Sequence, residues 1–169
     1  MNKSRPLPSI PAGSWVAVDT NILIYVNQGR SPQCVGFLGR CAGSELQGVV
    51  PASMLAELVH ALMLIEAREN HWIERGNPAR SLAERPDLVR RLSRYEASLR
   101  EFSAIGLRVE PVGEGDFWEA VRIQREAGLL TNDALLLAVA RRLNCEAVAS
   151  ADRRIAAAPG FKVYSPKDI

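Results

Sequence analysis

Five short apolar runs, each separated from the next by helical patterns, constrain the fold of this chain more than any other feature. The first run, residues 15–19, is almost continuously apolar until its last residue, which is typical of a central parallel strand covered on both faces. The other runs are residues 45–51, 107–112, 145–150 and 161–165. Strands that alternate with helices predict a layered α/β domain with a mainly parallel sheet of five strands.

The chain has 169 residues and 47% hydrophobic content, which suits one domain with a substantial core. We predict a single domain over residues 15–169, preceded by a flexible, Pro-rich N-terminal extension at residues 1–14. Residues 70–87 combine Gly, Pro and mixed charge with little periodicity, so we interpret them as a loop or insertion within the domain.

Composition excludes several classes of protein. No stretch approaches the roughly 18 consecutive apolar residues of a membrane span, and the first residues lack the apolar run of a signal peptide. The three cysteines form no C-x-x-C pair, which argues against a zinc site or a disulfide framework. We therefore expect a cytoplasmic protein with no membrane partner. The net charge of +2 is compatible with a nucleic-acid partner without requiring one.

Four acidic residues lie within or directly beside segments that are otherwise apolar and expected to be buried. Asp19 ends the first strand and Asp152 follows the fourth, so both belong to the carboxyl edge of the sheet, where α/β folds bind ligands. Glu57 lies early in a helix that is apolar almost all round, and Asp133 opens a helix whose next seven residues are apolar. Both helices read as buried, and both would bring one carboxylate toward the same edge.

Four clustered carboxylates repel one another unless a cation lies between them. A hard divalent cation such as Mg²⁺ binds a few carboxylates, keeps several waters and bridges to phosphate, and it can activate water for attack on phosphorus. The sequence has no Ser-His-Asp order and no phosphate-binding glycine motif. The acids therefore suggest phosphodiester hydrolysis that depends on Mg²⁺ or Mn²⁺.

Each acid also has a purely structural interpretation. Asp19 and Asp152 could cap the helices that follow them, and Asp133 could complement a helix dipole. Glu57 could pair with a buried Arg or with His60. We favour a shared metal site, because it explains all four acids at once, whereas the structural interpretations need a separate explanation for each acid.

The residues around these acids resemble the motifs of PIN-domain proteins, especially the VapC-type toxins. The matching segments are, in order, VAVDTNILIYV, PASMLAELVHAL, TNDALLLAVA and AVASADRRI. The resemblance runs from about residue 16 to residue 165. It implies a three-layer α/β/α fold with a five-stranded, mainly parallel sheet, and Mg²⁺- or Mn²⁺-dependent endoribonuclease activity.

The resemblance also implies roles for individual residues. Asp19, Glu57, Asp133 and Asp152 match the acids that bind metal and carry catalysis. Small polar residues that support those acids match Thr20, Asn21 and Ser150, for which helix capping is the alternative. Arg153 and Arg154 follow Asp152 directly, so we expect them beside the pocket as contacts for the RNA phosphates.

The family implies partners as well: an RNA substrate, a small VapB-like antitoxin that covers the acidic pocket, and a second copy of the chain in a homodimer. A PIN nuclease of RNA processing and a degenerate PIN binding module are alternatives to the toxin. A haloacid-dehalogenase-like phosphatase also opens with an Asp after its first strand. That family has a second Asp two residues later, where this chain has Asn21.

Overall fold

A parallel sheet lies at the centre of the protein, in a computed structural model that describes residues 4–73 and 76–169. Its six strands are β1 (Arg5–Pro6), β2 (Trp15–Val18), β3 (Gln47–Pro51), β4 (Arg108–Glu110), β5 (Ala147–Ala149) and β6 (Val163–Ser165). They lie in the order β1-β6-β5-β2-β3-β4, and each neighbouring pair is parallel. The five predicted strands are all present, which confirms the predicted α/β class.

The sheet has one strand more than the five we expected, because β1 pairs with β6 at the edge of the sheet. A two-residue strand that contains Pro6 leaves no apolar pattern in the sequence, and an edge is where a sheet accepts proline. The adjoining turn, η1 (Leu7–Ser9), buries Leu7, and Ile10 is buried as well. Residues 5–10 of the expected flexible extension thus belong to the folded domain, and residues 1–3 lie outside the described residues.

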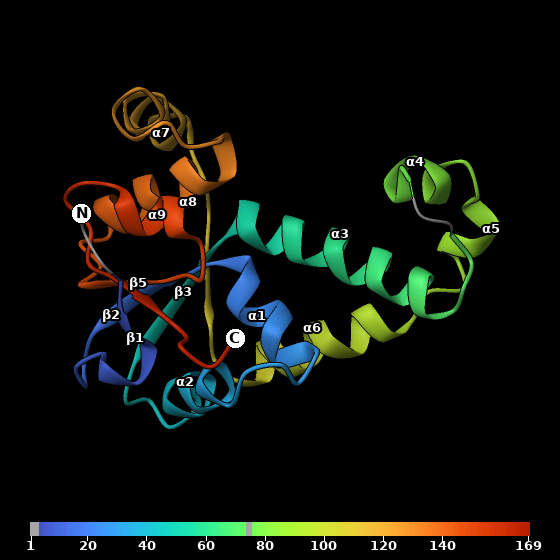
Figure 1. The fold of residues 1–169 in the computed structure, drawn as a ribbon, viewed down its shortest axis with the longest axis horizontal. Coiled ribbons are helices and arrows are strands. Elements are labelled where there is room, and N and C mark those ends of the chain that lie inside the picture. Colours follow the sequence, from blue (N-terminus) through green and yellow to red (C-terminus); the bar gives the residue numbers. More distant parts are fainter. Residues whose placement is uncertain (1–3, 74–75) are drawn as a thin grey trace.

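Helices cover both faces of the sheet, which makes the predicted three layers (Figure 1). The helices are α1 (Thr20–Asn27), α2 (Pro32–Ala42), α3 (Ala52–Glu69), α4 (Pro78–Ala83), α5 (Pro86–Val89), α6 (Arg94–Ala104), α7 (Glu114–Ala127), α8 (Thr131–Arg142) and α9 (Arg153–Ala157). In the view of Figure 1, α7, α8 and α9 lie above the sheet, and α1, α2 and α6 lie below it. Residues 134–140 of α8 are all buried, as their apolar run predicts.

The helices α3 and α6 run together away from the sheet and carry α4 and α5 at their far end (Figure 1). This end has a small apolar cluster of its own, made of Ala67, Ile73, Leu82, Leu88 and Leu92. The cluster lies apart from the main core, and the segment predicted as an insertion at residues 70–87 supplies part of it. In the described residues of that segment the chain therefore forms α4 and the start of α5 instead of an open loop.

The order of the strands also locates the edge where a ligand would bind. From β2 the chain moves to β3 and β4 on one side, and then crosses to β5 and β6 on the other side. In open parallel sheets a crevice forms outside the carboxyl ends of the two strands at which the order reverses. Here those strands are β2 and β5. Within residues 4–73 and 76–169, no helix is long and apolar enough to span a bilayer.

Candidate active site

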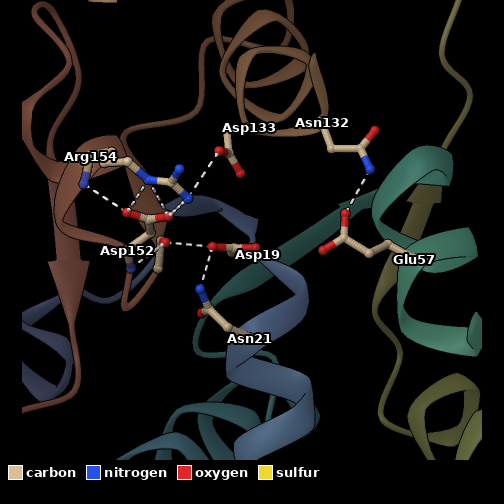
Figure 2. Close-up of polar contacts among 8 residues, drawn as sticks. Asp19, Asn21, Glu57, Asn132, Asp133, Asp152 and Arg154 are labelled. Atoms are coloured by element: carbon tan, nitrogen blue, oxygen red, sulfur yellow. Dashed lines mark hydrogen bonds and ion pairs between the residues drawn. The ribbon is translucent and has the colours of Figure 1, made fainter. Parts of the chain in front are cut away.

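Three of the four predicted acids follow the adjacent strands β5, β2 and β3, and the fourth lies at the start of α8, the helix that leads into β5. Asp19 follows β2 directly, and Asp152 lies just beyond β5. Glu57 is in the second turn of α3, which continues from β3, and Asp133 is in the first turn of α8. Figure 2 shows the side chains of all four acids directed toward the same region beyond the carboxyl ends of the strands. The fold thus places the four residues at the point where the strand order reverses.

Asp19 is the most buried of the four acids, with 5% of the residue exposed. Its Oδ2 accepts a hydrogen bond from Asn21 Nδ2 at 2.6 Å and another from the Ser150 hydroxyl. The pKa of Asp19 is raised from 3.8 to about 6, first by burial and then by the negative charges of Asp133 and Glu57, against the lowering effect of the hydrogen bond from Ser150. A backbone hydrogen bond from Asn21 also lowers the pKa of this carboxylate. Both described side-chain donors bind Oδ2, so Oδ1 is the oxygen that is open to an external cation.

Two of the three predicted supporting residues contact this carboxylate and also hold the segment that carries Asp152. Asn21 Oδ1 accepts a hydrogen bond from the backbone N–H of Ala151 at 3.1 Å. The Ser150 hydroxyl oxygen accepts one from the backbone N–H of Asp152 at 3.0 Å. Asn21 and Ser150 therefore connect the end of β2 to the loop after β5, as a pair of residues that orient metal ligands would.

Thr20 has a different role from the one we predicted. Its hydroxyl donates a hydrogen bond to the carbonyl oxygen of Met54 at 3.0 Å, which ties the start of α1 to the first turn of α3. This side chain is buried, and its contacts lie with Met54 instead of with the carboxylates. Thr20 thus holds together the two helices that carry Asp19 and Glu57, and it orients the acids only through the backbone.

Asp152 and Asp133 share the guanidinium group of Arg154 (Figure 2). Arg154 Nη2 lies 2.6 Å from Asp152 Oδ2 and 3.7 Å from Asp133 Oδ2. Hydrogen bonds from Arg154 hold the pKa of Asp152 below its ordinary value. The pKa of Asp133 is raised, first by burial and then by the charge of Asp152, against the attraction of Arg154. Arg153 is exposed and forms no ion pair within the described residues.

The prediction that Glu57 lies on a buried helix face is wrong. Its side chain is exposed, although its helix is apolar almost all round in sequence. The main core receives only one stripe of α3, which includes Met54, Leu58 and Leu62. Glu57 lies off this stripe, and its Oε2 accepts a hydrogen bond from Asn132 Nδ2 at 2.7 Å (Figure 2). Sequence reasoning missed Asn132. Its position beside Asp133 in the first turn of α8 was the only available signal.

The donor set at this site fits a hard divalent cation, although the ligands are not yet arranged around one. Within residues 4–73 and 76–169, no three Asp, Glu, His or Cys side chains are grouped so that they could hold a metal ion. Asp152 is turned to Arg154, and Glu57 is turned to Asn132. All four donors are nevertheless carboxylates, and the pKa of Asp19 is raised first by burial and then by the negative charges of Asp133 and Glu57, which a bound cation would offset. Carboxylate oxygens are the ligands that Mg²⁺ and Mn²⁺ prefer.

Comparison with known proteins agrees with this fold. The chain resembles VapBC2 of Rickettsia felis, solved bound to a promoter DNA fragment, with a TM-score of 0.61 and 13% identity over 89% of this chain and 97% of that one. A toxin–antitoxin complex from Klebsiella pneumoniae has a TM-score of 0.60 and 19% identity, and the match covers 92% of this chain and 100% of that one. FitAcB of Neisseria gonorrhoeae has a TM-score of 0.53 and 19% identity, and the match covers 92% of this chain and 99% of that one.

At these identities the solved structures establish only a common fold. No curated protein sequence matches the chain significantly. The sequence profile of the PIN domain, however, matches residues 16–160, which span all four acids and most of the chain. The resemblance inferred from the four motifs is thereby confirmed, and the chain belongs to the PIN domain family.

Proposed function

We propose that this protein is an endoribonuclease that uses Mg²⁺ or Mn²⁺, and that it is the toxin of a VapBC-type toxin–antitoxin pair acting in the cytoplasm. The observation that carries the proposal is Asp19. Its carboxylate is buried at the end of β2, receives both of its described side-chain hydrogen bonds on Oδ2, and is subject to the negative charges of Asp133 and Glu57. A scaffold would gain nothing from this arrangement, because buried charge without a partner is costly.

Four carboxylates would hold the metal: Asp19, Glu57, Asp133 and Asp152. The bound ion would polarise a phosphoryl oxygen and lower the pKa of a coordinated water. Asn21 and Ser150 donate to Oδ2 of Asp19 and so keep its other oxygen directed outward. Arg153, which is exposed beside Asp152, would bind the phosphate backbone of the RNA, and this contact positions a substrate without reading its sequence.

Cleavage of total cellular RNA in Mg²⁺ or Mn²⁺ tests the proposal, with Asp133→Asn as the inactive variant. The isosteric amide removes one negative ligand and leaves the helix start intact, so we expect cleavage to fall below detection while the circular dichroism spectrum is unchanged. Asp87→Asn, which neutralises an exposed acid far from the site at the start of α5, is the matched control and should cleave like the wild type. Full activity of Asp133→Asn, or activity that persists in EDTA, would refute the assignment.

The other candidate functions are separated by simple assays. In the phosphatase alternative a second Asp would be needed at position 21, and Asn21 instead donates to Asp19 and cannot transfer a proton. We therefore expect no turnover of a small phosphomonoester such as p-nitrophenyl phosphate. A degenerate binding module would not bind Mn²⁺ in a titration. A PIN nuclease of RNA processing would not arrest growth when it is expressed without a partner, whereas a toxin would.

The toxin assignment is supported by two of the similar structures, VapBC2 of Rickettsia felis and a toxin–antitoxin complex from Klebsiella pneumoniae. We propose an antitoxin that binds over the acidic site, with a basic side chain directed at the carboxylates. A co-purification of the chain with the product of any small adjacent gene would test this. Loss of the complex in Asp19→Asn, with Asp87→Asn unaffected, is the expected result.

A homodimer through α7 is the second partnership that we propose. One face of α7 carries Glu114, Phe117, Trp118, Val121 and Arg125, which are spaced as a single helical stripe. Phe117 is 49% exposed and Trp118 is 66% exposed, which is unusual for large apolar side chains in a monomer. The acid stands at one end of the stripe and the base at the other. Two antiparallel copies would therefore pair their apolar centres and set each acid beside the partner's base.

Reversal of this charge pattern tests the dimer by sedimentation. We expect Trp118→Ser and Arg125→Glu each to shift the wild-type dimer toward monomer. The double variant Glu114→Arg with Arg125→Glu should restore the dimer, because it inverts both ends of the stripe and keeps them complementary. A monomeric wild type at about 100 μM, well above the roughly micromolar Kd of a specific interface, would refute the proposal.

A further inference from the structure

Arg154 lies where a cation that joins Asp152 and Asp133 would have to lie (Figure 2). Its guanidinium group donates to both oxygens of Asp152, at distances of 2.6–3.2 Å. The same Nη2 atom is 3.7 Å from Asp133 Oδ2. The two acids come from α8 and from the loop after β5, so this one side chain joins two separate elements of the site.

This contact is too exposed to be explained by stability of the fold. The Arg154 side chain is 61% exposed, and ion pairs between exposed groups contribute little to the free energy of unfolding. A second contact also makes it redundant for the local structure. The backbone N–H of Arg154 donates to Asp152 Oδ1 at 2.7 Å and caps α9 whether or not the guanidinium is there.

We infer that Arg154 is an internal counter-ion of the metal-free site, and that a divalent cation must displace its guanidinium group from Asp152 and Asp133 in order to bind. This inference rests on the proposed metal site. The carboxylate of Asp152 is taken by the arginine, which contacts both of its oxygens.

The structure allows this exchange at little cost. The guanidinium group stands at the end of a long, mostly exposed side chain, so it can swing into solvent without disturbing the core. Asp152 keeps its orientation when the guanidinium leaves, because its backbone contacts remain: the cap to Arg154 N–H, and the hydrogen bond from Asp152 N–H to Ser150. The displaced guanidinium group would remain tethered to α9 near the site, where the phosphate of a substrate would supply its next anionic partner.

Removal of the side chain should therefore strengthen metal binding, which is the opposite of what loss of a structural support would do. We would measure the Kd for Mn²⁺ by calorimetry in 0.15 M salt for the wild type, Arg154→Ala and Arg153→Ala. The two variants remove the same charge from adjacent positions of α9, but only the first removes a contact to the acids. We expect Arg154→Ala to bind Mn²⁺ about three- to tenfold more tightly than Arg153→Ala, a range that suits the loss of one or two exposed ion pairs.

Mg²⁺ titration of the wild type, followed by the NMR signals of the arginine Nε–H groups, gives a second readout. The Arg154 signal should move with Mg²⁺ while the Arg153 signal stays in place. Equal affinities of the two variants, or weaker binding by Arg154→Ala, would overturn the inference.

Asp133→Asn separates the inference from the proposed function on which it rests. If the wild type binds Mn²⁺, Asp133→Asn does not, and the two arginine variants bind equally, then the metal site stands and the counter-ion role is refuted. If only Arg154→Ala binds measurably, the role is supported in its strongest form. If no variant binds Mn²⁺, the metal site and the counter-ion role fail together.

Discussion

Neutralising Asp19 should stabilise the metal-free protein, although it should also destroy the proposed metal site. The pKa of Asp19 is raised from 3.8 to about 6, mainly because the group is buried. Between about pH 4 and pH 6 the folded protein holds a proton that the unfolded chain has released. The free energy of unfolding therefore falls as the pH rises through this interval, and the loss is complete above pH 6.

The structure sets the size of the effect. The difference between 3.8 and about 6 corresponds to about 3 kcal/mol, at about 1.4 kcal/mol for each pH unit. Asp19→Asn should recover most of this, because Asn21 and Ser150 both donate to the same oxygen and one amide oxygen can accept from both. The new amide nitrogen takes the place of Oδ1, to which no described side chain donates, and the negative charges of Asp133 and Glu57 favour it there.

Urea unfolding in EDTA at intervals from pH 4 to pH 8 measures the difference directly. We expect Asp19→Asn and the wild type to have equal free energies of unfolding at pH 4. At pH 8 the variant should be more stable by up to about 3 kcal/mol, or by about 6–12 °C in Tm for a domain of this size. Asp87→Asn should follow the wild type at every pH. If Asp19→Asn is less stable than the wild type by the same amount at pH 4 and pH 8, the argument from burial is refuted.

Substitutions at three further positions test the packing of the domain that carries the site, each by urea unfolding at pH 7. Glu66→Ala should lower the free energy of unfolding by about 2 kcal/mol, because this buried carboxylate accepts three backbone N–H groups at the start of α6, and Glu66→Gln should cost less. Gly48→Ala should cost about 1–3 kcal/mol, since the new Cβ would lie 2.4 Å from Leu107 Cδ2; an unchanged stability would mean that Leu107 moves freely. Thr20→Val should cost about 1 kcal/mol through the lost hydrogen bond to Met54, and no loss would remove Thr20 from the link between α1 and α3.

The apolar periodicity of the sequence was sufficient to predict five of the six strands, and with them Asp19 and Asp152, which follow two of these strands. Asp19 and Asp152 interrupt apolar runs at their ends, and a parallel sheet necessarily collects such positions at one edge. The position of Asp133 could be predicted equally well, because the seven residues after it are apolar. The structure buries all seven of them in α8. Each of these patterns is local in the sequence, and each predicts a position at the same edge of any parallel sheet.

What the sequence could not predict depends on relations between distant segments. The all-round apolarity of α3 suggested a buried Glu57, but the apolar residues of this helix serve two separate clusters, the main core near Leu58 and the far cluster near Ala67. Glu57 remains exposed between them. The hydrogen bond from Asn132 to Glu57 joins residues 75 positions apart, and the strand β1 depends on pairing across almost the whole chain. Neither leaves a periodic signal.

The four acids differ in how firmly they are held, and this difference suggests how the site would assemble. Asp19 is buried and fixed by two donors, whereas the side chains of Asp133 and Asp152 are each 21% exposed and Glu57 is more open still. Arg154 is a cationic partner of Asp133 and Asp152, whereas the described donors to Asp19 and Glu57 are uncharged. Of these two, only Asp19 is buried. A cation would therefore be drawn first to the buried carboxylate of Asp19, and the outer acids, held by exposed partners that can turn away, would close around it.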